Sequence, residues 1–274
     1  MKTLKDHTII YDNECPMCDL YTSAFVKSGM LPENGRAAYD VASSSVPSCQ
    51  LDWSKARNEI ALVNTKTGEV TYGIQSLLKV LGQNFPALRF LARNMTFVWV
   101  MKKVYSFISY NRKVIMPGHA TGPQACTPSF NLKYRLLYLV FAWIVVSLIL
   151  NAYSALLVPI IPPGNISREF LICGGQVVFQ LLVVTLLGEK RIMDYLGNMM
   201  TVSLAGAGVL FIGFQLRYIV PAPVFFTSFF LGTAALMFLE HFRRMKLLKM
   251  SPWLTVSWML YRLLVLIAIY AFAQ

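Results

Sequence analysis

Two cysteines three residues apart give this sequence its clearest capacity for chemistry. Cys15 and Cys18 enclose a Pro-Met pair. The residues before them, His7–Tyr11, are rich in β-branched and aromatic side chains and predict a short strand. From Pro16 to about Lys27 the pattern is helical, and proline suits the first helical position because it has no N–H to leave unpaired. We therefore expect Cys15 at the N-cap and Cys18 one turn later, both near an exposed helix start.

A cysteine pair in this position favours thiol–disulfide exchange. Unpaired N–H groups and the helix dipole stabilise a thiolate, which makes Cys15 the nucleophile, and Cys18 can then resolve a mixed disulfide. Two alternatives stay open, a metal site and a cysteine pair without a redox role. A zinc site needs about four ligands. The other cysteines and histidines considered as ligands add no second motif at ligand spacing: His7, Cys49, His119 and Cys126.

Asp12 is expected between the strand end and the helix start. Its carboxylate could accept and return the proton of the resolving thiol, or it could simply cap the turn, and the two roles are compatible. Glu14 and Asp19 add further negative charge close to the cysteines. Because negative charge opposes a thiolate, we expect a thiol pKa that is only slightly lowered and a reducing couple.

The remaining pattern of the first half predicts an α/β, thioredoxin-like order of strand, helix, strand, hairpin and helix. The expected strands after the first are Arg36–Tyr39, Glu59–Asn64 and Glu69–Tyr72, and the expected helices are Ile74–Leu81, Pro86–Arg93 and Thr96–Ser109.

The cysteine motif lies in a longer segment that resembles a known family. Ile9-Ile10-Tyr11-Asp12-Asn13-Glu14-Cys15-Pro16-Met17-Cys18 resembles the opening of the DCC family of thiol–disulfide oxidoreductase-like proteins, named for Asp-x-x-Cys-x-x-Cys. The hairpin and the Tyr110-Asn111-Arg112 stretch also resemble that family, so the likeness covers about residues 5–117. It implies a thioredoxin-like fold with Cys15 and Cys18 as the redox pair. No proline immediately precedes the 59–64 strand, so substrate recognition differs from that of ordinary thioredoxins, or the substrate is not a peptide.

The second half has the composition of a membrane protein. The whole chain is 56% hydrophobic and only 14% charged, and residues 132–274 hold 11 Lys/Arg and 4 Asp/Glu, mostly between long apolar runs. Runs of about 20 apolar residues span a bilayer core. An α-helical bundle of about five transmembrane helices is therefore expected, with spans Leu136–Leu157, Phe170–Leu187, Met199–Val220, Val224–Leu239 and Trp253–Phe272.

Loop charges predict the orientation of this bundle. Eight lysines and arginines flank the spans on one side and two, Arg168 and Arg217, on the other. The positive-inside rule then places the N-terminus in the cytoplasm and the C-terminus outside, in what we expect to be a bacterial inner membrane. The N-terminus also lacks the apolar stretch of a signal peptide. Much of the net charge of +12 thus reflects topology, and we expect the lipid bilayer as a partner and no nucleic acid.

One charged residue falls in the middle of an expected span. Arg262 lies about ten residues into the last span, where a guanidinium is costly unless it faces protein or water. Gln180 is the expected partner, with Gln176 one turn away. The hypothesis is a polar site for an anionic or carbonyl group such as a quinone-like carrier, and the alternative is an arginine that snorkels or bonds helix-end carbonyls. Apart from such a carrier and the redox disulfide, no cofactor is expected.

Two functions fit these observations. The first is a membrane-anchored thiol–disulfide oxidoreductase that exchanges electrons with a protein thiol partner or a membrane carrier. The second is a non-catalytic accessory or assembly subunit of a membrane complex, which keeps the fold as a binding module. In both, the expected organisation is a thioredoxin-like domain over residues 1–117, a linker over 118–131 and a transmembrane domain over 132–274.

Overall fold

A computed structural model describes residues 2–45, 51–118, 129–158, 160–219 and 223–271. The chain divides into two compact units, Met1–Tyr134 and Arg135–Gln274. Three of the residues weighed as metal ligands lie outside the described residues: Cys49, His119 and Cys126.

The first unit is built on a mixed four-stranded sheet. Its strand order is β2-β1-β3-β4, in which β2 runs parallel to β1, while β3 runs antiparallel to both β1 and β4. In this register Ile9 of β1 lies between Arg36 of β2 and Leu62 of β3. The strands are β1 His7–Tyr11, β2 Arg36–Ala38, β3 Ala61–Asn64 and β4 Val70–Tyr72.

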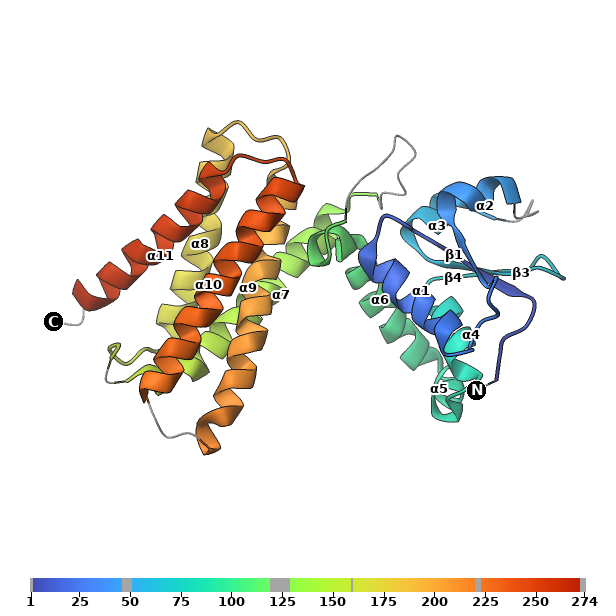
Figure 1. Ribbon diagram of the computed structural model, residues 1–274, viewed down its shortest axis with the longest axis horizontal. Helices are drawn as coiled ribbons and strands as arrows, with labels where there is room; N and C mark the ends of the chain where they lie inside the picture. Colours follow the sequence, from blue (N-terminus) through green and yellow to red (C-terminus); the bar gives the residue numbers. More distant parts are fainter. Residues whose placement is uncertain (1, 46–50, 119–128, 159, 220–222, 272–274) are drawn as a thin grey trace. The chain divides into compact units, whose positions relative to one another are not determined.

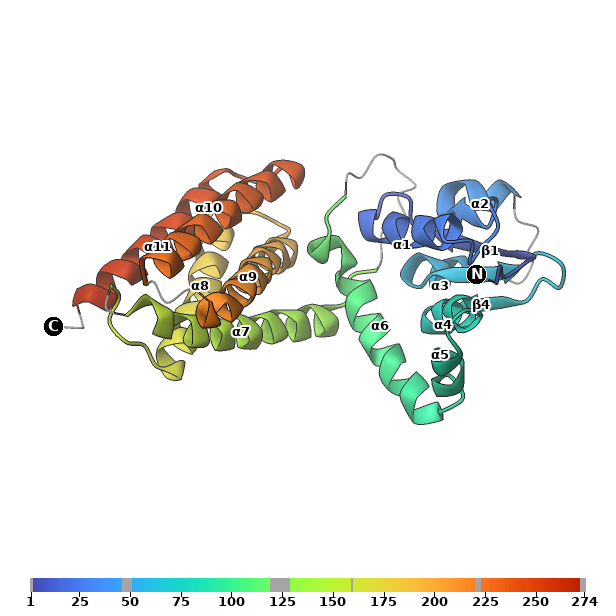
Figure 2. The ribbon, with the colours of Figure 1, turned by 60° about the horizontal axis from the view of Figure 1, so that its bottom comes forward.

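Helices cover both faces of this sheet (Figure 1). Side chains alternate along a strand, so Ile9 and Ile10 of β1 enter different cores. Ile9 packs with Phe25 and Val80 from α1 and α4, and Ile10 packs with residues of α2 and α3. Figure 2 shows α5 beside α4, with α6 following them. The helices are α1 Pro16–Lys27, α2 Tyr39–Ser45, α3 Trp53–Asn58, α4 Ile74–Gly82, α5 Pro86–Leu91 and α6 Met95–Ile115.

Several helices and strands predicted for this unit are confirmed, whereas the predicted thioredoxin-like fold is only partly present. The strand β1 and the helix that begins at Pro16 are confirmed at the predicted bounds, and the hairpin is also present. The helices α2 and α3 were not predicted, because an amphipathic period cannot be recognised over seven and six residues. The unit is a small α/β fold, a mixed sheet with helices, and not a full thioredoxin fold.

The second unit is a bundle of five helices that are long and apolar enough to cross a membrane. The number of predicted spans is confirmed. The third helix begins seven residues earlier than predicted, at Ile192, because polar residues of its first turns are bonded inside the bundle: Asn198 accepts a hydrogen bond from Arg244 at 2.9 Å. The helices, drawn in Figure 1, are α7 Leu132–Ser154, α8 Ile166–Leu186, α9 Ile192–Gln215, α10 Pro223–Leu247 and α11 Trp253–Ala271.

The helix α9 lies at the centre of this bundle. It is the most buried of the five helices. Its Tyr195 and Met199 belong to a core that also contains Leu254 and Trp258 of α11. A glycine brings it close to α10, because a Cβ at Gly206 would lie 2.1 Å from the sulfur of Met237. Small residues let neighbouring transmembrane helices approach each other in this way.

Candidate functional site

The turn after β1 places both cysteines at the start of α1. Cys15 is the N-cap residue and Pro16 the first helical residue, as predicted. The turn is held by Asp12, whose backbone oxygen accepts from the N–H of Cys15 at 3.2 Å and whose side chain accepts from the N–H of Glu14 at 3.1 Å. Cys18 follows one turn into the helix, and both thiols are free.

The two thiols are buried, which corrects the expectation of an exposed helix start. Cys15 is 2% exposed and Cys18 6% exposed. Backbone that follows α6 lies against the residues on either side of Cys15: a Cβ built on Gly118 would lie 2.0 Å from the carbonyl oxygen of Glu14 and 2.9 Å from the ring of Pro16. A cover supplied from about a hundred residues away has no signature in the local sequence around the motif.

Arg112 of α6 forms a buried ion pair with Asp12. Its Nη2 donates to Oδ2 of Asp12 at 2.9 Å, and both side chains are almost fully buried. The same nitrogen donates to the backbone oxygen of Arg57 at 3.1 Å. Sequence reasoning assigned Arg112 no role beyond its place in a stretch that resembles the DCC family. The only signal that could have found it was the need of a buried Asp12 for a cation.

The charges around the motif move the pKa values of the two thiols in opposite directions. A hydrogen bond from the Cys18 thiol is the largest cause that lowers the pKa of Cys15, to about 7, and the positive charge of Arg112 lowers it further, while burial opposes both. The pKa of Cys18 is raised, first by its hydrogen bond with Cys15 and then by burial. Cys15 is therefore the thiol that carries negative charge near neutral pH.

The carboxylates near the motif oppose the lowering of the Cys15 pKa less than expected, while the hydrogen bond from Cys18 remains its largest cause. The expectation of a small effect counted Asp12 and Asp19 as free negative charges. In the structure Asp12 is paired with Arg112, and Asp19 is paired with Arg36 of β2. Each arginine reduces the negative potential that its carboxylate exerts on the thiolate.

A cavity of about 200 Å³ adjoins Cys18 within this unit. Tyr21 and Tyr105 line it, and burial raises the pKa of both phenols, so both stay protonated and able to donate. Tyr105 accepts a hydrogen bond from the N–H of Ile60 at 2.9 Å. The charged residues Asp12 and Arg112 line the same cavity as Cys18, and most of its other lining residues are apolar or aromatic.

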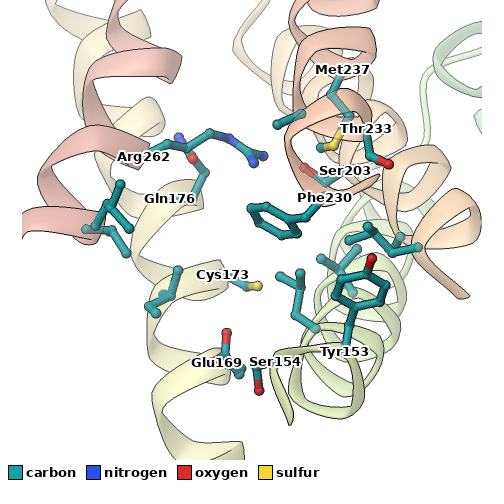
Figure 3. A pocket seen from close by; sticks show the side chains of 18 of the residues that line it. Tyr153, Ser154, Glu169, Cys173, Gln176, Ser203, Phe230, Thr233, Met237 and Arg262 are labelled. Carbon is teal, nitrogen blue, oxygen red and sulfur yellow. The ribbon is translucent and has the colours of Figure 1, made fainter. Parts of the chain in front are cut away.

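The residues expected to form a polar site in the bundle are only partly together. Arg262 and Gln176 line a second cavity, of about 300 Å³, and Gln180 does not. The side chain of Gln180 instead accepts from Tyr195 at 2.5 Å and from Ser257 at 3.2 Å. Figure 3 shows Arg262 and Gln176 on one side of this cavity. Among the residues described, no cluster of three or more His, Cys, Asp or Glu side chains could hold a metal ion.

Comparisons with known proteins add no identification to this geometry. No family model matches the chain, and neither the curated proteins nor the solved structures give a match. The likeness of residues 5–117 to the DCC family therefore stays a hypothesis drawn from the motif. On the structure alone, the chain is a protein with five candidate membrane spans and a buried Cys-x-x-Cys pair at the start of a helix.

Proposed function

We propose that this protein is a membrane-anchored thiol–disulfide oxidoreductase in which Cys15 attacks and Cys18 resolves. The single observation that carries the proposal is the placement of the cysteine pair at the start of α1, with Cys15 at the N-cap and Cys18 one turn later. The lowered pKa of Cys15 beside a raised pKa of Cys18 agrees with it. One activated and one protonated thiol at a helix start is the arrangement that stepwise exchange requires. The resemblance of the cysteine motif to that of the DCC family supports the same function.

The proposed reaction passes two electrons from the dithiol to a partner disulfide. The Cys15 thiolate attacks one sulfur of that disulfide, forms a mixed disulfide and releases one partner thiolate. Cys18 then attacks the sulfur of Cys15, which releases the second partner thiolate and closes the Cys15–Cys18 disulfide. A dithiol protein or a reduced membrane carrier must then return two electrons to the pair.

The attack by Cys15 makes the later attack by Cys18 easier. The raised pKa of Cys18 comes first from its hydrogen bond with Cys15. Once Cys15 is held in a mixed disulfide its negative charge is gone, and the Cys18 thiol becomes easier to deprotonate. We assign the acceptance of that proton to Asp12, which lines the cavity beside Cys18 and is held in place by Arg112.

A trapping experiment tests this function. In full-length protein a Cys18→Ser substitution should leave Cys15 joined to its partner as a mixed disulfide that reductant releases. The matched control is Cys15→Ser, which should trap nothing. The wild-type pair should also titrate reversibly as a two-electron couple, read by the mass of alkylated protein across a series of glutathione ratios. A pair that never closes a disulfide under oxidising conditions would reject the proposal.

The burial of both thiols favours a second function, an accessory subunit of a membrane complex. A partner disulfide reaches Cys15 only if the residues that bury it move, and the backbone at Gly118 lies against its neighbours Glu14 and Pro16. If the cysteines are structural, a variant with both changed to serine should still assemble with the same membrane proteins and support their activity. If they are catalytic, assembly should persist while that activity is lost.

We also propose that the N-terminal unit is cytoplasmic and the C-terminus external. Eight basic residues lie where α7, α9 and α11 begin and where α8 and α10 end, and two lie at the opposite helix ends. Basic residues flanking transmembrane helices are retained on the cytoplasmic side.

A further inference from the structure

The cavity in the helical bundle has a layer of polar side chains midway along the helices. Arg262 is the middle residue of α11 and Gln176 the middle residue of α8, each about 15 Å from both ends of its helix at ~1.5 Å per residue. Ser203 of α9 lies at the corresponding level and also lines the cavity. In Figure 3 the guanidinium of Arg262 extends toward the cavity above Phe230, with Ser203 across from it.

The polar atoms of these three side chains are not matched by the polar groups that the structure describes. Among the residues described, no hydrogen bond or ion pair is made by the guanidinium of Arg262, the amide of Gln176 or the hydroxyl of Ser203. Gln176 is only 6% exposed, and its amide nitrogen is fully buried. The guanidinium lies over the ring of Trp258, whose centre is 3.9 Å away. Leaving such donors unmatched inside a bundle is costly, so the arrangement calls for an acceptor in the cavity.

The acceptor must carry negative charge. Arg262 is a permanent cation, and the only carboxylate lining the cavity among the described residues is that of Glu169. That carboxylate is already paired with Arg168 at 2.7 Å, near the start of α8 and two turns from Gln176. A neutral carbonyl would satisfy the hydrogen-bond donors and leave the charge of Arg262 uncompensated in a medium of low dielectric constant.

The rest of the cavity is apolar and open to the lipid side. Its lining includes Leu231 of α10 and Leu263 of α11, which are 62% and 51% exposed on the surface of the bundle. With about 300 Å³ the cavity has room for a head group and part of an alkyl chain, whose remainder can leave between these two helices.

We propose that this cavity binds an anionic amphiphile, a single carboxylate or phosphate on a hydrocarbon chain, with its head group on Arg262, Gln176 and Ser203. The bundle is then a ligand-binding domain as well as an anchor. This site does not depend on the redox function, so a protein with both Cys15 and Cys18 changed to serine should bind the amphiphile unchanged.

Quenching of Trp258 fluorescence tests the proposal. The full chain is placed in bilayers of zwitterionic phosphatidylcholine and titrated with stearic acid that carries a nitroxide near its carboxyl end, at a pH where the acid is ionised. We expect saturable quenching that a Trp258→Phe variant lacks. The methyl ester of the same probe should need a concentration at least about tenfold higher, because it cannot form a charge-assisted pair.

Variants decide whether Arg262 is the receptor of the charge. Arg262→Gln should weaken binding of the acid about tenfold and abolish the preference over the ester, whereas Arg262→Lys should keep that preference. The matched control is Arg217→Gln, which removes an arginine outside the cavity lining. If Arg262→Gln does not fold, Gln176→Leu and Ser203→Ala must each weaken binding of the acid. Equal binding of acid and ester, or unchanged binding in these variants, would overturn the proposal.

Competition then identifies the source of the charge. Restoration of fluorescence by unlabelled oleate indicates a carboxylate ligand, and restoration by dioleoyl phosphatidate at lower mole fraction indicates a phospholipid. Either result supports the anionic class. Displacement by a neutral decyl benzoquinone that is equally strong in the wild type and in Arg262→Gln would contradict it.

Discussion

The reactivity of Cys15 depends on charges that oppose each other across one buried ion pair. Arg112 lowers the pKa of Cys15 and Asp12 raises it. The thiolate is the reactive form, so alkylation speeds up as pH rises through the thiol pKa. Arg112 and Asp12 form one ion pair but shift the pKa of Cys15 in opposite directions. Substituting each residue separately can therefore distinguish the two effects.

The first prediction concerns the pH dependence of alkylation at Cys15. In the wild type the rate of reaction with iodoacetamide should be half-maximal near pH 7. Arg112→Gln removes a charge that lowers the pKa, so the midpoint should move to higher pH, and Asp12→Asn should move it to lower pH. Mass spectrometry of the peptide containing Cys15 measures both. Shifts in the same direction for the two variants would contradict this account.

The second prediction concerns stability. Arg112→Met leaves the Asp12 carboxylate buried without its cation, and losing one partner of a buried pair costs about 3–5 kcal/mol. The double variant Arg112→Met with Asp12→Leu should recover most of that loss, since no charge then remains buried. The readout is the temperature at which Cys18 of the full-length protein becomes reactive to maleimide. A double variant less stable than Arg112→Met would show that the pair is not the source of the loss.

At the scale of elements, the backbone that follows α6 covers the start of α1. A Cβ at Gly118 would meet the backbone oxygen of Glu14, which cannot move aside as a flexible side chain can. We expect this backbone to limit access to Cys15, while Arg112, on the helix before it, lowers the pKa of Cys15 in addition to the hydrogen bond from Cys18. Access and acidity should therefore respond to different substitutions.

The third prediction separates these two effects. Gly118→Ala should force the cover away from Glu14 and raise the alkylation rate of Cys15 several-fold, and its pH midpoint should stay or move to lower pH, because burial raises the pKa of Cys15. Arg112→Gln should move the midpoint the other way. Gly82→Ala is the matched control, because a Cβ there meets its neighbours no closer than 3.6 Å. Rates that are the same in wild type and Gly118→Ala would mean that this segment does not limit access.

The whole molecule joins a small α/β unit to a bundle with five candidate spans. An odd number of spans puts the two ends of the chain on opposite sides of the membrane, so the position of the cysteine pair follows from the orientation of the bundle. The distribution of basic residues is the only indication of that orientation.

The fourth prediction is the topology. An alkaline phosphatase fusion at the C-terminus should be active, and a fusion in the connection between α8 and α9, at residues 188–191, should be inactive. Green fluorescent protein fused at the same two points should give the reciprocal pattern. The opposite result would place Cys15 and Cys18 on the external side and require an oxidising partner there.

The sequence by itself determined the features that depend on neighbouring residues. The strand His7–Tyr11, the helix that begins at Pro16 and the cysteine at its N-cap follow from local propensities and from the missing N–H of proline. The number of spans follows from apolar length, because a bilayer leaves few other ways to bury such runs. The two short helices α2 and α3 escaped prediction since they are stabilised by packing on the Ile10 face of the sheet.

Only the tertiary structure decided which polar groups meet. Arg112 and Asp12 are 100 residues apart, and nothing in either local pattern encodes their pairing. Gln180 was the expected partner of Arg262, yet Tyr195 and Ser257 bind its side chain, which leaves Arg262 facing a cavity beside Gln176. Hydropathy and periodicity determine that a residue is buried or spans a membrane. The choice among several possible partners depends on how helices rotate and pack against each other, and that is a property of the whole fold.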